Sequence, residues 1–329
     1  MHREDLINSS SISIVIPIYN EGSVINELYN RLTEVITKII KPDIYELIFI
    51  NDCSIDDSLS IIKNLAKKDP HVKFISFRKN FGQTAALAAG FDFAAGKIIV
   101  SMDGDLQHLP EDIPKLIEKM NEGYDIVSGW RKKRNDNVFF RKIPSRTANW
   151  LMFKLSGVNI HDFGTTLKAY KSDIIKNVRL YGEMHRFIPA LAAVQGISIA
   201  ELPIENPHRP YGKSNYGISR TFRVLCDLLT VKFLISFSTR PLHIFGFIGL
   251  SAFLAGFIID FIFTLLWIFG KADYDNNKGL ILFSVMLIIL GVQFIVLGLL
   301  SEILVRVYFE TTDKKIYSVK ETNLTKELI

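Results

Sequence analysis

The sequence predicts an α/β domain built on a mostly parallel sheet, followed by two helices that span a membrane. Short β-branched apolar runs alternate with longer helical patterns between residues 12 and 130. Two long apolar runs then occupy residues 244–270 and 279–301. The mean hydropathy of +0.21 is high for a soluble domain, and these two runs account for the excess.

Five strands are expected, and each is followed by a helical pattern or a polar turn. The predicted strands are 12–17, 46–50, 72–76, 97–102 and 124–128. The predicted helices are 22–40, 56–68, 82–95 and 111–121. Nearly continuous apolar strands have both faces covered, which is typical of parallel sheets with helices on each side. Ligands of such sheets bind at the carboxyl ends of the strands, so the residues after each strand are the site candidates.

Polar residues follow three of these strands. Tyr19-Asn20-Glu21 follows the first strand, Asn51-Asp52 follows the second, and Asp103-Gly104-Asp105 follows the fourth. Neither a dinucleotide-binding fingerprint nor a phosphate-binding P-loop is present. Any bound phosphate must therefore be neutralised by a metal ion or by side chains.

The acidic turn suits a hard divalent cation such as Mg²⁺ or Mn²⁺. Asp103 and Asp105 supply carboxylate oxygens, the Gln107 carbonyl lies nearby in sequence, and substrate oxygens and water complete the shell. The alternative is an ordinary acidic turn that caps the next helix. The place of the turn at the end of a central strand favours the metal site.

The segment 131–146 contains seven basic residues and one acidic residue. One interpretation is a solvated loop attracted to anionic lipid, and the other is a phosphate-binding segment. Arg141 and Ser145 would share a helical face, and Arg131 follows the fifth strand. The net charge of +5 agrees with a phosphate-bearing partner, but does not choose among nucleic acid, nucleotide and lipid.

The two apolar runs each exceed the length of about 20 residues that crosses a bilayer. Basic residues flank the pair, so both termini and the α/β domain are expected on the cytoplasmic side. Asp260 inside the first run predicts a helix–helix contact in a homo-oligomer or a role in lipid handling, and both alternatives stay open. The expected division is 1–217 (α/β domain), 218–241 (amphipathic helix), 242–305 (two spans) and 306–329 (cytoplasmic tail).

Four stretches of the chain carry a family resemblance: IVIPIYNE (14–21), NDCSIDDS (51–58), RKNFGQTAALAAGF (78–91) and SMDGDLQHLPEDIPKLI (101–117). They resemble GT-A glycosyltransferases of family 2, in the group of dolichol-phosphate mannose synthases and bacterial polyprenyl-phosphate glycosyltransferases. The stretch DFGTTLKAYKSDII (162–175) and the C-terminal hairpin look like the bactoprenol glucosyltransferase branch. The resemblance spans residue 12 to about residue 305.

The resemblance implies a role for each matching residue. The residues implied to bind the nucleotide sugar are Pro17, Tyr19, Glu21, Asp52, Asp103, Arg209 and Lys213. The implied metal ligands are Asp103, Asp105 and Gln107, and the implied acceptor-phosphate ligands are Arg131, Arg141 and Ser145. The implied catalytic residues are Asp103, Asp105, Arg131 and Asp162, the last of which would orient sugar or acceptor. Asn51 and Cys53 depart from the Asp and Gly usual in the family, and Lys213 stands in for a missing final lysine.

The expected activity is inverting transfer of a hexosyl group from a nucleotide sugar to polyprenyl (undecaprenyl) phosphate at the inner membrane. UDP-glucose is the favoured donor, with GDP-mannose as the alternative. The partners are then donor, acceptor and membrane lipid, without nucleic acid. A non-catalytic lipid-phosphate-binding scaffold is the alternative from another class, and the intact acidic turn argues against it. A processive polysaccharide synthase is disfavoured because the Q-x-x-R-W segment is lacking.

Overall fold

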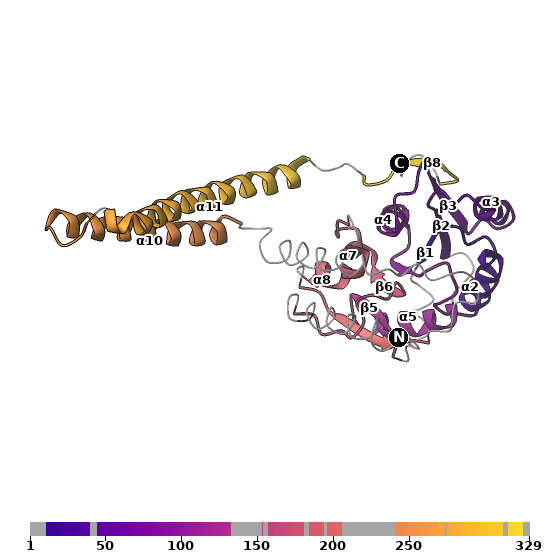
Figure 1. The fold of residues 1–329 in the computed structure, drawn as a ribbon. Helices are drawn as coiled ribbons and strands as arrows, with labels where there is room; N and C mark the ends of the chain where they lie inside the picture. Colours follow the sequence, from indigo (N-terminus) through magenta and orange to yellow (C-terminus); the bar gives the residue numbers. More distant parts are fainter. Residues whose placement is uncertain are drawn as a thin grey trace. The chain divides into compact units, whose positions relative to one another are not determined.

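The computed structural model describes residues 11–39, 45–132, 153, 157–180, 184–193, 196–205, 241–273, 275–311 and 315–324. The chain forms two compact units. One comprises residues 1–235 together with 315–329, and the other comprises residues 236–314. Figure 1 shows the helices and strands of both units.

The first unit is organised around a sheet with the strand order β7-β5-β6-β4-β1-β2-β3-β8. The strands are β1 (Ile12–Ile18), β2 (Tyr45–Asn51), β3 (Val72–Phe77), β4 (Ile98–Ser101), β5 (Ile126–Trp130), β6 (Lys168–Lys171), β7 (Ile199–Pro203) and β8 (Val319–Thr322). β1 pairs in parallel with β2 and β4, β2 with β3, and β5 with β7. The predicted mostly parallel sheet is confirmed, and the five predicted strands lie within two residues of their observed bounds.

Two strands run against the others. β6 lies antiparallel between β4 and β5, and β8 pairs antiparallel with β3 at one edge of the sheet. An antiparallel strand begins where its parallel neighbours end. The start of β6 therefore reaches the edge at which β4 and β5 finish.

Helices cover both faces of the sheet (Figure 1). The helices of the first unit are α2 (Ile25–Ile39), α3 (Ser58–Lys68), α4 (Gln83–Phe93), α5 (Ile113–Asn121), α7 (Ser172–Ile175) and α8 (Ile188–Ala193). Leu28 of α2 and Leu116 of α5 share one core with Ile14 and Ile16 of β1. Val15, between those two strand residues, belongs to the core on the other face, with α4. Side chains alternate across a strand, which explains this division.

The second unit is a helical hairpin. Its helices are α10 (Pro241–Ile268) and α11 (Lys278–Thr311), with a 3₁₀ turn at Asp275–Asn277 between them. Phe245–Ile268 and Lys278–Ser301 have mean hydropathies of 2.1 and 2.9, and only 11% of each span is buried. A core helix of a soluble protein would be mostly buried. By length and composition, both helices are candidate membrane spans.

Small residues bring the two helices together. A Cβ atom on Gly249 would lie 2.6 Å from the Gly291 carbonyl oxygen, and one on Gly256 would lie 2.6 Å from the Ser284 carbonyl oxygen. Close backbone approach through small residues is a common mode of helix packing in membranes. Ser284 also donates its hydroxyl to the Asp260 carboxylate. Asp260 therefore contacts the other helix of its own hairpin, and the expected roles in a homo-oligomer or in lipid handling stay predictions.

The chain returns to the first unit after the hairpin. β8 pairs with β3, and the Tyr317 hydroxyl donates to the Asp92 carboxylate at 2.7 Å. The Tyr317 ring also stacks on Phe77 at 5.4 Å between centroids. The sequence-based division placed this segment in a tail, whereas residues 315–324 complete the sheet. The expected amphipathic helix at 218–241 lies outside the described residues, apart from Pro241 at the start of α10.

Candidate active site at the carboxyl edge of the sheet

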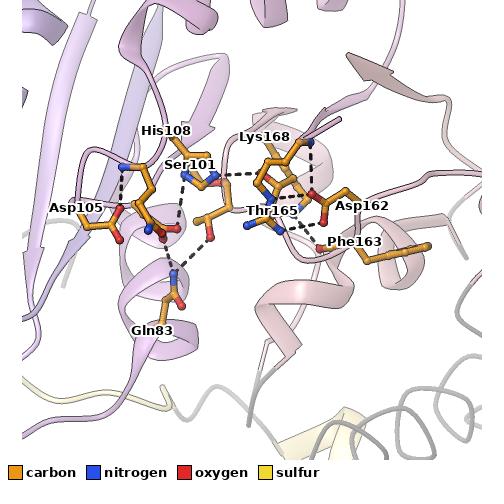
Figure 2. A network of polar contacts seen from close by, with 12 residues as sticks. Gln83, Ser101, Asp105, His108, Asp162, Phe163, Thr165 and Lys168 are labelled. Atoms are coloured by element: carbon orange, nitrogen blue, oxygen red, sulfur yellow. Dashed lines mark hydrogen bonds and ion pairs between the residues drawn. The ribbon is translucent and has the colours of Figure 1, made fainter. Parts of the chain in front are cut away.

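The candidate site gathers the segments that follow β1, β2, β4 and β5 with the segment that precedes β6. The register pairs Lys168 of β6 with Ser101 of β4 and with Ser128 of β5. Residues 162–167 therefore arrive at the same edge as the acidic turn after β4. Figure 2 shows the resulting polar network, in which α4 supplies Gln83.

The turn after β1 is tied to the turn after β2. The Asn20 amide N–H donates to Ser54 Oγ at 3.0 Å, and the Ile55 N–H donates to Asn20 Oδ1 at 2.9 Å. Asn20 has a φ of 57°, in the left-handed region that asparagine tolerates better than most residues. Tyr19 stands beside this junction with 49% of its surface exposed. Pro17 and Glu21, on either side, are half-buried.

Asp52 is buried beneath the turn between β3 and α4. Its carboxylate accepts the backbone N–H groups of Phe81 at 2.7 Å and Gly82 at 2.8 Å. Burial raises the pKa of the Asp52 carboxyl, and the two amide hydrogen bonds oppose that rise. Asn51 is also buried and donates to Ser76 Oγ at 3.1 Å. Cys53, where the family usually has glycine, keeps a left-handed φ of 57°.

The acidic turn presents Asp103, Asp105 and Gln107 at the end of β4. The Gln107 N–H donates to Asp105 Oδ1 at 3.1 Å, which fixes the turn. In the part of the chain that is described, no cluster of three or more His, Cys, Asp or Glu residues could hold a metal ion by itself. Two carboxylates and an amide oxygen form a hard but incomplete ligand set. That set fits a Mg²⁺ or Mn²⁺ ion whose remaining ligands come from a substrate and water.

Asp103 is surrounded by neutral donors. Gln83 Nε2 donates to Asp103 Oδ1 at 2.6 Å, and Thr166 also hydrogen-bonds this carboxylate. Nδ1 of the buried His108 lies 3.5 Å from Asp103 Oδ2, and its Nε2 contacts Thr165 Oγ1 at 3.2 Å. Burial lowers the pKa of His108 to about 4, so the imidazole is neutral at pH 7. Burial raises the pKa of Asp103, while Thr166, Arg131, Lys168 and Gln83 oppose that rise.

Arg131 forms a two-pronged ion pair with Asp162. Its Nε donates to Asp162 Oδ2 at 2.7 Å, and its Nη2 donates to Oδ1 at 2.9 Å. The side chains are 16% and 5% exposed, so the pair is largely withdrawn from solvent. Glu201 of β7 accepts the His161 and Asp162 backbone N–H groups at 2.9 Å each. The sheet itself thus fixes the segment that orients Arg131.

Lys168 is a buried cation behind the site. Its ammonium group donates to the carbonyl oxygens of Phe163 and Thr165, and the residue is 1% exposed. Burial lowers the pKa of Lys168 to about 7, and the Asp162 charge acts in the opposite direction. These bonds hold residues 163–165 in the curve that places Thr165 and Thr166 beside the acidic turn (Figure 2).

The structure brings together five of the residues that sequence analysis selected. Asp103, Asp105, Arg131 and Asp162 belong to one network, with Gln107 in the same turn. Arg141, Ser145, Arg209 and Lys213 lie outside the described residues. Sequence analysis assigned no role to Gln83, Thr166, Lys168 or Glu201. Gln83, Thr166 and Lys168 lie in the stretches 78–91 and 162–175, which carry the family resemblance. The resemblance therefore marked these segments, but it did not show which groups the three side chains contact.

Comparison with known proteins decides the family. Residues 13–179 match the sequence model of glycosyl transferase family 2. The chain belongs to this family. A dodecaprenyl-phosphate galacturonate synthase from Rhizobium johnstonii is 39% identical over 325 residues, covering 96% of this chain and 94% of the relative. An undecaprenyl-phosphate 4-deoxy-4-formamido-L-arabinose transferase from Shewanella sediminis is 35% identical over 315 residues, covering 95% and 93%. The expected family membership is confirmed.

Solved structures agree on the fold. Glucosyl-3-phosphoglycerate synthase from Mycobacterium tuberculosis, solved with Mn²⁺, UDP and its product, superposes with a TM-score of 0.54 at 16% identity. The match covers 71% of this chain and 82% of that structure. At this identity the likeness concerns the fold alone. It confirms the GT-A arrangement of the first unit.

Proposed function

We propose that this family 2 glycosyltransferase moves a sugar from a nucleotide sugar to a polyprenyl phosphate at a membrane surface. The observation that carries the proposal is the meeting of the acidic turn with the Arg131–Asp162 pair at one sheet edge. Asp103 and Asp105 provide the negative side of the site, and Arg131 provides a cation close to it. A donor diphosphate with its metal ion and an acceptor phosphate need these two kinds of group.

On the donor side, Asp103, Asp105 and Gln107 hold a divalent cation, Mg²⁺ or Mn²⁺, together with the diphosphate. Bound there, such a cation offsets the charge that develops on the leaving diphosphate. Pro17, Tyr19, Glu21 and Asp52 line the nucleotide pocket, and Asp103 also reaches the ribose. Arg209 and Lys213, which lie outside the described residues, are assigned to the binding of the nucleotide sugar.

On the acceptor side, Arg131 acts with Arg141 and Ser145 on the lipid phosphate. An acceptor phosphate is already anionic at pH 7, so its attack on the anomeric carbon requires no strong general base. The new bond forms on the face of the anomeric carbon opposite the departing diphosphate, so the anomeric configuration is inverted. Catalysis then consists of positioning and charge stabilisation. Asp162 serves this step by aiming the guanidinium of Arg131.

The names of the relatives bear on the sugar. The names of the two relatives give galacturonate and 4-deoxy-4-formamido-L-arabinose as the sugar, whereas sequence analysis favoured UDP-glucose as the donor. Both relatives use a prenyl phosphate, so the acceptor class is the better supported part of the proposal. The candidate donors are therefore nucleotide-linked galacturonate, nucleotide-linked 4-deoxy-4-formamido-L-arabinose, UDP-glucose and GDP-mannose.

We further propose that the two ends of the hairpin lie on the same, cytoplasmic side of the inner membrane. Residues on both sides of the hairpin belong to the first unit, since β8 pairs with β3. A hairpin with two spans returns the chain to the side from which it started. Basic residues that flank the spans assign that side to the cytoplasm.

Donor screening with the purified full-length protein tests the proposal. The protein in detergent would receive a short polyprenyl phosphate, Mn²⁺ and one nucleotide sugar at a time, with mass detection of the lipid product. We expect a mass increase of one sugar residue with at least one donor. Absence of lipid product with the whole panel, from protein that remains folded, would overturn the proposed activity.

A further inference from the structure

The stretch 78–91 identifies the family but has no role in the mechanism above. In the structure it forms the turn after β3 and the first part of α4. Phe81 and Gly82 donate their backbone N–H groups to Asp52, and the Gln83 side chain donates to Asp103. Three consecutive residues thus contact carboxylates that follow two different strands, β2 and β4.

The contact between Gln83 and Asp103 links α4 to the acidic turn. Gln83 Nε2 lies 2.6 Å from Asp103 Oδ1, and it also lies 3.4 Å from Thr166 Oγ1. An amide nitrogen has two hydrogens, so one Gln83 side chain can serve both oxygens. The side chains that donate hydrogen bonds to Asp103 here, Gln83 and Thr166, are an amide and a hydroxyl and carry no charge. They can orient the carboxylate without cancelling its charge.

The helix that carries Gln83 is itself fixed. A Cβ atom on Gly90 would lie 2.1 Å from Val15 Cγ1, so α4 packs directly against the central strand. Gly82, immediately before the helix, has a φ of 88°, a conformation that suits glycine. Its N–H is held by Asp52. The amide of Gln83 therefore starts from a backbone that cannot shift easily relative to the sheet.

We propose that Gln83 is a positioning residue that holds the Asp103 carboxylate in the orientation required by the metal-bound nucleotide sugar. The inference rests on the proposed function, because it assumes that Asp103 meets the cation or the ribose. Residues that orient metal ligands through hydrogen bonds commonly change metal affinity by about 10-fold to 100-fold when they are replaced. A residue that only begins a helix changes stability instead.

Two substitutions in the same helical turn separate these roles. Gln83→Met keeps the length of the side chain and removes both N–H donors. Thr84→Val is the matched control, because it removes the 2.7 Å contact with buried His185 Nδ1 but does not touch Asp103. Mn²⁺ binding in the presence of UDP is measured by electron paramagnetic resonance of the free ion. Thermal unfolding of the same full-length samples gives the structural readout.

We expect Gln83→Met to weaken Mn²⁺ binding with UDP at least about tenfold and to raise the KM for the donor. Thr84→Val should leave that binding unchanged, even where its unfolding temperature falls further. Unaltered Mn²⁺ binding in Gln83→Met, or equal losses in both variants, would overturn the positioning role. If the unmutated protein transfers sugar but binds no Mn²⁺ with the nucleoside diphosphate of its donor, the positioning role falls while the transfer activity stands. If the unmutated protein transfers no sugar, the proposed function falls as well.

Discussion

Asp103 and Asp105 are separated by one glycine, yet their surroundings differ. Asp103 accepts side-chain hydrogen bonds from α4 and from the segment before β6, whereas Asp105 accepts the Gln107 N–H of its own turn. A carboxylate held from several directions is suited to orienting a ligand.

Asp105→Asn should lower transfer by at least about 100-fold while the fold is retained, because several kcal/mol of charge stabilisation are lost. The control is Asp173→Asn, an exposed acid in the first turn of α7. The measurement is the initial rate of lipid product with excess donor, repeated after chelation with EDTA. Full activity of the unmutated enzyme in EDTA would contradict the metal requirement.

The Arg131–Asp162 pair should matter for stability as well as for transfer. Asp162→Asn leaves a largely buried guanidinium without its carboxylate, which costs about 3–5 kcal/mol of unfolding free energy. Glu34→Gln is the matched control, because its pair with Lys38 is solvent-exposed and should contribute little. Equilibrium unfolding of the detergent-solubilised protein, followed by intrinsic fluorescence, gives both values. Similar small losses in the two variants would show that solvent screens the inner pair.

For single residues, the sequence predicted which side chains lie at the ends of strands, but not which groups those side chains contact. Asp103 and Arg131 could be placed at one edge because they follow strands that the apolar pattern identifies. Gln83 and Lys168 could not, because their roles depend on how α4 packs and on the direction of β6. A lysine in a short strand-like segment is predicted to lie at the surface, which is wrong for Lys168. Only the register shows Lys168 between Ser101 and Ser128.

Among the elements, the strands that sequence analysis missed have weak apolar patterns. β8 has the sequence VKET and lies at the sheet edge, with none of its four residues buried. β6 and β7 are short and contain charged residues. The five strands that could be predicted lie in the interior of the sheet or carry longer apolar runs, where both faces are covered. Pairing of β8 depends on the long return of the chain after the hairpin, which no local pattern encodes.

Asn323 continues the β8 edge with a side chain. Its Oδ1 accepts the Phe74 N–H at 2.8 Å, and its Nδ2 donates to the Val72 carbonyl oxygen at 3.0 Å. Asn323→Ala should cost about 1–3 kcal/mol locally and accelerate amide hydrogen exchange at Phe74. Lys320→Ala, an exposed neighbour in β8, is the control and should leave that amide protected. Unchanged exchange at Phe74 in Asn323→Ala would contradict this role.

At the level of the whole molecule, the sheet and the hairpin are interleaved along the chain. The hairpin is inserted between the main part of the first unit and the strand that completes its sheet. A chain cut at residue 240 would therefore lose the two helices and β8 together. Loss of activity in such a truncation could not be assigned to the membrane helices, because the outer edge of β3 would also be unpaired.

Replacement of residues 241–311 by a flexible linker separates the two effects. A Gly/Ser linker of about 30 residues has a root-mean-square reach of about 30 Å and keeps residues 315–324 in the chain. The site residues all belong to the first unit, so this variant should still bind nucleotide and transfer sugar to a short, detergent-soluble polyprenyl phosphate. Transfer to a long, membrane-embedded acceptor should fall, because the two spans no longer anchor the enzyme at the lipid surface.

The quantity to compare is the ratio of long-chain to short-chain transfer rates in the full-length and linker variants. We expect the ratio to fall when the hairpin is replaced, and the chain cut at residue 240 to unfold at a lower temperature than the linker variant. The physical reason is that the linker variant retains the β3–β8 pairing and the contact of Tyr317 with Asp92. If the folded, nucleotide-binding linker variant transfers sugar to neither acceptor, the hairpin contributes to the site itself and is more than an anchor.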